Sequence, residues 1–283
     1  MSVEPDSYQI ESILSEIPLN SQTGIVVAGI EMTASPLHAI GRVEGLVGLL
    51  EKFYKDDRLG EIEFIQLSGG YTGKGEDGEL LGLSEAEFMY LILDRLSNKP
   101  DNLAFELTGL QSPSENTNTS GMRYGYLSLR NHNIIVLLDE EATSTRANFA
   151  KTPELISTAK DPLKGDFNVI LVTGTSRPSS SRAISELRGN LKRAMKNRFT
   201  DVDDMDEVDS MDEYDPNAME HVQIHMYQEH AETPYSDMNM GITERMKSNR
   251  KFDAYILGTL SKLGFGQAMD SVSKGRTLPK QHS

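Results

Sequence analysis

The sequence predicts an α/β protein built on a mainly parallel β-sheet with helices on both faces. Short β-branched, apolar runs alternate along the chain with longer segments in which apolar residues recur every three or four positions. This alternation is typical of parallel sheets, because consecutive parallel strands must be joined by a crossover, which is usually a helix. The chain has 283 residues and no cysteine, and it is long enough to bury a sizeable core without disulfides.

The first half of the chain supplies two predicted strands and two predicted helices. Residues 24–30 (GIVVAGI) are β-branched and bounded by glycine, which indicates a buried strand. In residues 35–55 the apolar side chains fall on one face of a helix. Residues 61–70 (EIEFIQLSGG) form the second predicted strand, and residues 83–96 form the second helix. This helix opens with Ser84 and a glutamate three residues later, the pattern of a capping box.

The second half of the chain continues the alternation. The further predicted strands are residues 133–138, 167–175 and 221–230. The further predicted helices begin near Ser144 and span residues 177–198 and 243–264, and residues 121–129 (GMRYGYLSL) are assigned to a helix as well. Right-handed crossovers between these strands would give a Rossmann-like three-layer α/β/α fold.

The predicted organisation is a single domain with additions. Residues 1–23 form an N-terminal helical extension, residues 24–265 form one Rossmann-like domain, and residues 266–283 form a flexible basic tail. Two segments, near 98–131 and 200–220, do not fit the alternation of strands and helices. We therefore expect both to be insertions in loops.

Most of the net charge of −15 belongs to one acidic segment. Residues 201–220 hold ten acidic residues and neither lysine nor arginine. This charge argues against a nucleic-acid-binding surface, which requires a basic face, and it suggests a basic protein partner at residues 201–215. The sequence contains no apolar run of 18 or more residues and no signal-peptide pattern, so we expect a cytoplasmic protein without a membrane span.

Small and polar residues follow the predicted strands, at the edge where ligands bind in open α/β sheets. Each of these residues alone could simply cap the helix that follows it. Because the carboxyl ends of parallel strands meet at one edge, we expect the residues that follow four of the strands to form one ligand site. The candidates after the first, second and fourth strands are Gly29, Glu31, Ser68, Gly69, Gly70, Thr173, Thr175 and Ser176.

Residues 139–150 (DEEATSTRANFA), after the third strand, carry more polar groups than a helix cap needs. Thr143 or Ser144 would cap the following helix. Thr145 and Asn148 lie three apart on the first predicted helical turn, where the helix N-terminus favours a polar or anionic group.

Glu141 has two interpretations that the sequence leaves open. It would accept hydrogen bonds from ligand hydroxyl or amino groups, or bind a metal ion. Alternatively, it would pair with Arg42 or Arg182 and hold loops together without taking part in any chemistry.

Familiar ligand-binding motifs are absent or incomplete. Residues 68–78 (SGGYTGKGEDG) lack both the first glycine of a phosphate-binding loop and the serine or threonine that would follow Lys74. No Gly-x-Gly-x-x-Gly follows the first strand. His221 and His225 would share a face, but no cysteine supports a zinc site there. The acidic spacing of residues 201–215 is not that of a calcium-binding loop.

Five segments resemble, in this order, the YdcF-like family, which includes SanA and ElyC: SPLHAIGRVEGLVGLLEKFYK, IQLSGG, LSEAEFMYLIL, DEEATSTRANFA and NVILVTGTSRPSSSRA. The resemblance covers roughly residues 24–190. The histidine that the family often carries after its Val-Thr-Ser strand end is absent, so no acid–base role carries over. The positions that match the family's pattern are Arg42, Ser68, Gly69, Gly70, Ser84, Glu85, Ala86, Glu140 or Glu141, Thr143, Thr145, Asn148, Val172, Thr173, Arg182 and Ala183.

The resemblance implies a Rossmann-like domain in a family of largely unknown function. For one branch of the family it implies binding of S-adenosylmethionine, and for another it implies functions at the cell envelope or on lipid carriers. We therefore expect a protein that binds a nucleotide-like or phosphorylated small molecule, with S-adenosylmethionine or Mg²⁺ as the candidate cofactors.

Two other functions are alternatives at this point. A metal-assisted phosphoester or pyrophosphate hydrolase would place Glu31, Glu85 and Glu141 around Mg²⁺. The phosphate of its substrate would then lie on Arg42 and Arg182. A non-catalytic interaction protein would instead use the acidic segment to dock a partner.

Overall fold

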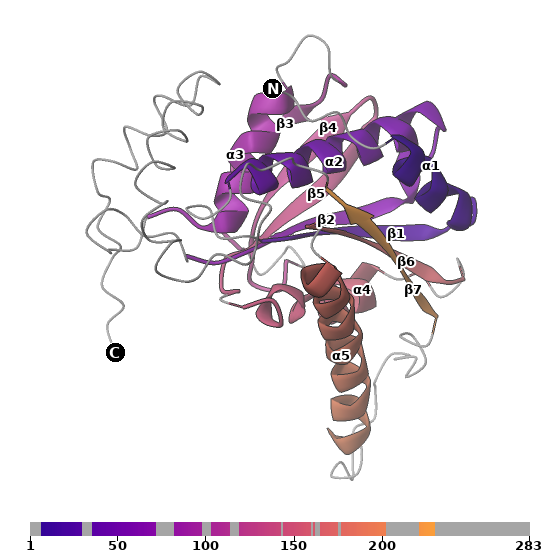
Figure 1. Ribbon diagram of the computed structural model, residues 1–283, viewed down its shortest axis with the longest axis vertical. Coiled ribbons are helices and arrows are strands. Elements are labelled where there is room, and N and C mark those ends of the chain that lie inside the picture. The colour runs from indigo at the N-terminus through magenta and orange to yellow at the C-terminus, as the bar shows by residue number, and fades with distance from the viewer. Residues whose placement is uncertain are drawn as a thin grey trace.

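The computed structural model describes residues 7–29, 36–71, 82–97, 103–113, 119–142, 144–159, 161, 165–174, 177–201 and 221–229. Within these residues the chain forms one seven-stranded, mostly parallel sheet with helices packed against it (Figure 1). This arrangement confirms the predicted α/β class. No helix in the described part of the chain is both long enough and apolar enough to cross a membrane.

The strands and helices follow the predicted alternation closely. The strands are β1 (Gln22–Ala28), β2 (Ile62–Ser68), β3 (Glu106–Leu107), β4 (Arg123–Leu129), β5 (His132–Asp139), β6 (Phe167–Thr173) and β7 (Val222–Gln228). The helices are α1 (Ser7–Glu16), α2 (Pro36–Lys55), α3 (Glu85–Ser97), α4 (Thr152–Ala159) and α5 (Arg177–Asp201), with short 3₁₀ turns η1 (Leu59–Glu61) and η2 (Ala147–Phe149).

The strand order is β3-β4-β5-β2-β1-β6-β7. Strands β5, β2, β1, β6 and β7 are parallel to their neighbours in this series, whereas β4 is antiparallel to both β5 and β3. From β1 the chain builds outward through β2 to β5, and it then returns to the other side of β1 to add β6 and β7. The strand order therefore reverses between β1 and β6, with β6 and β7 on one side and the other five strands on the other.

Neighbouring residues of each strand point to opposite faces of the sheet, and apolar side chains gather in two separate clusters. In β1, Ile25 and Val27 belong to one apolar cluster, whereas Val26 and Ala28 belong to another. Helices α1, α2 and α3 complete the first cluster, and α4 and α5 complete the second (Figure 1).

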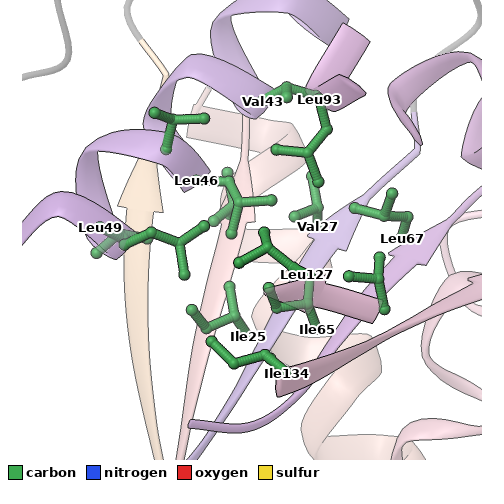
Figure 2. Packing of buried hydrophobic residues seen from close by; sticks show 14 of the residues in the cluster. Ile25, Val27, Val43, Leu46, Leu49, Ile65, Leu67, Leu93, Leu127 and Ile134 are labelled. Atoms are coloured by element: carbon green, nitrogen blue, oxygen red, sulfur yellow. The ribbon is translucent and has the colours of Figure 1, made fainter. Parts of the chain in front are cut away.

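The first cluster is the larger one, and α2 lies at its centre. Figure 2 shows Val43, Leu46 and Leu49 of α2 and Leu93 of α3 directed toward apolar side chains of the strands. Leu46 and Leu49 are fully buried. Burying a leucine side chain contributes about 1.5–3 kcal/mol relative to leaving it in water, so this row of residues is a large part of what holds α2 on the sheet.

The prediction of a helix at residues 121–129 is wrong, because these residues contain β4. Their side chains alternate between buried and less buried positions, with Tyr124 and Leu127 in the core. Tyr124 packs in one apolar cluster and Leu127 in the other, so apolar groups lie on both faces of this strand. A tight turn at Arg130, whose φ is 53°, returns the chain into β5. The segment near 98–131 thus extends the sheet by β3 and β4, in addition to its loops.

The predicted helix from Ser144 is also wrong in its first part. Residues 147–149 form only a 3₁₀ turn, and the α-helix starts at Thr152. Pro153 explains the interruption, because proline has no amide hydrogen to donate to Phe149 and its ring would clash with the preceding turn. Proline is well tolerated in a first helical turn, where α4 places it.

The N-terminal helix predicted before the first strand is present as α1, and it is held to the body of the domain by Arg58. The guanidinium donates hydrogen bonds to the carbonyl oxygens of Leu14 (3.1 Å) and Ile17 (3.0 Å), and its charge is balanced by Glu61 at 2.7 Å. Residues 243–264, predicted as a helix, and the predicted tail at 266–283 lie outside the described residues.

Two helical glycines give a matched test of packing between α2 and β7. A Cβ on Gly45 of α2 would collide with the ring of Tyr227, a large and fully buried side chain of β7. We expect Gly45→Ala to destabilise the fold by about 1–3 kcal/mol through overpacking. A Cβ on Gly189 of α5 would meet only the end of the Arg193 side chain, at ordinary contact distance, so Gly189→Ala should stabilise the fold by roughly 0.5–1 kcal/mol through helix propensity.

Chemical denaturation of both variants checks this expectation. Two changes of the same sign would contradict it, because the substitution and the helical context are the same and only the neighbouring ring differs.

Candidate functional site

The structure brings predicted site residues from several strands to the carboxyl edge of the sheet. Ser68 at the end of β2 pairs with both Ala28 of β1 and Asp139 of β5. Thr173 at the end of β6 pairs with Gln228 of β7. The small and polar groups that follow these strands therefore occupy one edge, as the sequence predicts.

Arg42 of α2 is the buried cation at this edge, with 4% of its surface exposed. Its Nη1 donates hydrogen bonds to the carbonyl oxygens of Ala28 (2.5 Å) and Gly29 (2.8 Å), where β1 ends. Burial lowers the pKa of Arg42 from its ordinary value, while the negative charges of Glu229 and Glu85 act in the opposite direction. Its Nε has no hydrogen-bond partner among the described residues.

Glu85 is the carboxylate that lies over the ends of β1 and β2. It is the first residue of α3, and its position explains the glycines below it. A Cβ added to Gly29 or to Gly69 would collide with the Glu85 side chain. Gly69 also has a φ of 155°, which L side chains rarely adopt. The two glycines therefore make room for a carboxylate at the centre of the edge.

Glu229 follows β7 and is completely buried. One of its carboxylate oxygens lies 2.5 Å from Nδ1 of His38, and its backbone N–H donates to the carbonyl of Thr173. The sequence analysis omitted both Glu229 and His38 from the candidate site. The same reasoning about strand ends, extended to residues 221–230, would have found Glu229.

Glu140 forms the more buried of the two ion pairs in the loop after β5. The Glu140 carboxylate accepts two hydrogen bonds of 2.6 Å from Arg123 and one of 2.7 Å from Ser84. Burial acts to raise the pKa of Glu140, but these hydrogen bonds and the charge of Arg123 outweigh it and lower the pKa. Glu140 thus serves to fasten β4, α3 and the β5 loop together.

Glu141 points into solvent instead. Its side chain is 82% exposed and lies 3.1 Å from Lys151. The predicted pairing of Glu141 with Arg42 or Arg182 is therefore wrong: Arg42 binds the end of β1, and Arg182 is exposed on α5. Glu141 is thus exposed to solvent and pairs with Lys151 at the surface of the edge.

A buried polar network lies behind the loop, between the sheet and α4. Gln66 of β2 accepts a hydrogen bond from Thr152 (2.8 Å) and lies 3.4 Å from both Asp139 and the carbonyl of Asn148. The side chain of Asp139 is also 3.4 Å from the hydroxyl of Ser68. Burial raises the pKa of Asp139 to about 6, although Lys151 and Ser68 act in the opposite direction.

The remaining predicted residues of this loop have different placements. The hydroxyl of Ser144 accepts the N–H of Ala147, the first residue of the 3₁₀ turn, at 3.2 Å. Thr145 is partly exposed and Asn148 is buried, and the carbonyl of Ser144 accepts the Asn148 N–H. The candidates that lie outside the described residues are Glu31, Thr143, Thr175 and Ser176.

Among the residues that the structure describes, no group of three or more histidine, aspartate or glutamate side chains is placed to hold a metal ion. His225 lies near Asn168 (3.2 Å) and Glu16 (3.3 Å) in β7, and His221 lies near Asp166. The side chains of His221 and His225 therefore contact different residues and do not converge on one point.

Neither the models of known protein families, nor the curated proteins, nor the solved structures include a match to this chain.

Asp139→Asn should flatten the pH dependence of stability. Burial raises the pKa of this carboxyl from 3.8 to about 6 on folding, so folding takes up a proton between these pH values. The contribution of Asp139 to stability is then greatest below the unfolded pKa and falls as the pH rises through the folded pKa. Since one pKa unit corresponds to about 1.4 kcal/mol, the loss is on the order of 2–3 kcal/mol.

Denaturant unfolding of the wild type and Asp139→Asn at several pH values measures this loss. The variant should gain stability relative to the wild type between about pH 4 and 7. Parallel pH profiles would show that Asp139 does not titrate in this way.

Neighbouring glutamates give a second test. At neutral pH, Glu140→Gln should destabilise the fold by about 1–2 kcal/mol, because it leaves the guanidinium of Arg123 without its closest carboxylate. The effect is moderated by solvent, since the Arg123 side chain is 31% exposed. Glu141→Gln, at an exposed carboxylate, should change stability by less than about 0.5 kcal/mol.

The loss of stability in Glu140→Gln should depend on pH. The lowered pKa of Glu140 means that its contribution is present above the unfolded pKa and disappears as the pH falls through the folded pKa. The difference between wild type and Glu140→Gln should therefore shrink in acid. A difference that is constant down to acidic pH, or an equal effect of Glu141→Gln, would argue against the ion pair as the cause.

Proposed function

We propose that the chain binds a nucleotide-like or phosphorylated small molecule, with S-adenosylmethionine as one candidate, at the carboxyl edge of the sheet. The proposal includes a Rossmann-like three-layer fold and kinship with the YdcF-like family. The observation that carries it is the strand order β5-β2-β1-β6-β7, which reverses between β1 and β6. In open α/β sheets the helices after two such strands lie on opposite faces, and ligands bind in the crevice between them.

Arg42 supports a polar ligand beside the end of β1. Its Nε is buried and has no partner among the described residues, and an unsatisfied buried donor destabilises a protein by about 1–3 kcal/mol. Its Nη1 already binds the β1 carbonyls. A ligand oxygen that reaches Nε would remove this penalty, so ligand binding and stability of the edge would be linked.

The neighbouring groups favour ligand hydroxyl or amino groups, rather than a bare phosphate, next to Glu85. The first amides of α3 are already used: those of Glu85 and Ala86 bind the carbonyls of Gly70 and Gly69, and that of Glu87 binds the Ser84 hydroxyl. The exposed part of the edge includes the carboxylate of Glu141. Ionised carboxylates only accept hydrogen bonds, so a ribose or an ammonium group is the better partner.

A thermal-shift screen tests this function. The panel contains S-adenosylmethionine, its demethylated product, nucleotides, sugar nucleotides and polyprenyl phosphates, each with and without Mg²⁺. A ligand at 100 times its Kd adds about 2.7 kcal/mol of stability, which should raise the unfolding midpoint by several degrees. We expect a nucleoside-containing compound to give the shift.

Two variants locate the binding. Glu85→Gln and Glu141→Ala should each reduce the shift, because both remove a carboxylate from the carboxyl edge. Glu63→Gln is the matched control, since Glu63 lies near the opposite end of β2 and contacts Gln22. A shift that Glu63→Gln also abolishes, or the lack of a shift with every compound, would contradict the proposed site. A shift that requires Mg²⁺ would favour the hydrolase alternative.

A further inference from the structure

Helix α5 carries an exposed basic face that the ligand site does not use. Between Arg177 and Thr200 its sequence holds seven lysine or arginine residues and a single acid, Glu186, in a chain with a net charge of −15. Arg188 and Lys192, four residues apart, lie on one face and are exposed. Neither has an ion-pair partner among the described residues.

This face is shaped as a shallow groove open to solvent. Ser181, Ser185, Arg188, Gly189 and Lys192 line it, together with the edge of Ile184. Gly189 has no side chain to fill the groove, and the guanidinium of Arg193 lies within contact distance of its position, which adds a third cation. These cations beside hydroxyl groups and a glycine suit an extended acidic chain.

The chain itself provides such a segment, at the end of this helix. Residues 202–220 follow Asp201 directly and contain nine acids and no basic residue. They connect α5 to His221, whose carbonyl accepts the N–H of Phe167 at the start of β6. The connection therefore has to run from the far end of α5 back to the edge of the sheet where β6 and β7 begin.

Helix α5 is longer than the strand that precedes it. Its 25 residues span about 37 Å, whereas the seven residues of β6 span about 23 Å. The apolar contacts of α5 with the sheet come from Ala183, Leu187 and Leu191, and the helix projects past the sheet beyond them (Figure 1). The two ends of residues 202–220, Asp201 and His221, are therefore separated along the projecting part of α5, which begins next to Lys192.

We propose that the basic face of α5, centred on Arg188 and Lys192, is the docking surface for the chain's own acidic segment 202–220. Charge complementarity and the covalent connection both support this occupant over an external one. The acidic segment would then shield the basic groove from other anionic molecules, and an external basic partner would have to displace it from α5.

Cross-linking in the cysteine-free chain tests the proposal. Gly189→Cys and Ser210→Cys introduce one thiol in the groove and one in the acidic segment, and no native thiol competes. We measure the rate of intramolecular disulfide formation in the full chain at low and high salt. Docking predicts a rate that falls as the salt concentration rises, because exposed ion pairs are screened.

Charge variants separate docking from simple tethering. Adding Arg188→Glu and Lys192→Glu should slow the cross-link about threefold to tenfold, while the linker length stays the same. Lys52→Glu with Lys55→Glu on α2 is the matched control, with an equal change in net charge on another exposed face, and should leave the rate unchanged. Asp209→Lys with Asp212→Lys should restore the rate in the Arg188→Glu, Lys192→Glu background.

Three results would overturn the proposal. They are an unchanged rate in the Arg188→Glu, Lys192→Glu variant, an equal loss in the α2 control, and disulfides that form only between two chains. Unfolding midpoints of all variants establish that each one is folded, and surface substitutions of this kind are usually tolerated.

Discussion

The bonds from the buried guanidinium of Arg42 to the end of β1 are the interaction on which the carboxyl edge depends. The cation comes from α2, and its charge is offset by Glu85 from α3 and by Glu229 after β7. Buried charges are tolerated only when their partners are in place, and removing one partner is strongly destabilising. Arg42 therefore links α2 to the end of β1, with the carboxylates of Glu85 and Glu229 near enough to favour its charge.

The polar groups on the two sides of this edge differ in how far they are paired. On the β5 side, Glu140 is engaged by Arg123 and Ser84, and Gln66 joins the sheet to α4 through Thr152. These polar groups satisfy one another and hold the loop after β5. At the β1 side, Arg42 keeps a donor without a partner among the described residues. The polar groups after β5 are paired with one another, whereas a donor remains available beside β1. This difference suits a ligand bound where the strand order reverses.

Much of the fold could be predicted from the sequence, whereas the partners within the site could not. Apolar β-branched runs such as 133–138 have few alternatives to a buried strand. Residues 121–129 were predicted as a helix because glycine and tyrosine make the alternation of a strand hard to recognise. The helix predicted from Ser144 starts later because Pro153 cannot occupy the interior of a helix. The contact between His38 and Glu229 joins residues 191 positions apart, which no local pattern encodes.

The short turn at Arg130 has a consequence for how the chain reaches this structure. It joins β4 to β5, neighbours in both sequence and sheet, so this hairpin closes a very small loop. Hairpins form within about 1–10 μs, whereas β1 can meet β6 only after more than a hundred intervening residues have been gathered in. We expect the antiparallel edge to act as an early template onto which β2 is laid, and the pairing of β1 with β6 to be among the last parts of the sheet to form.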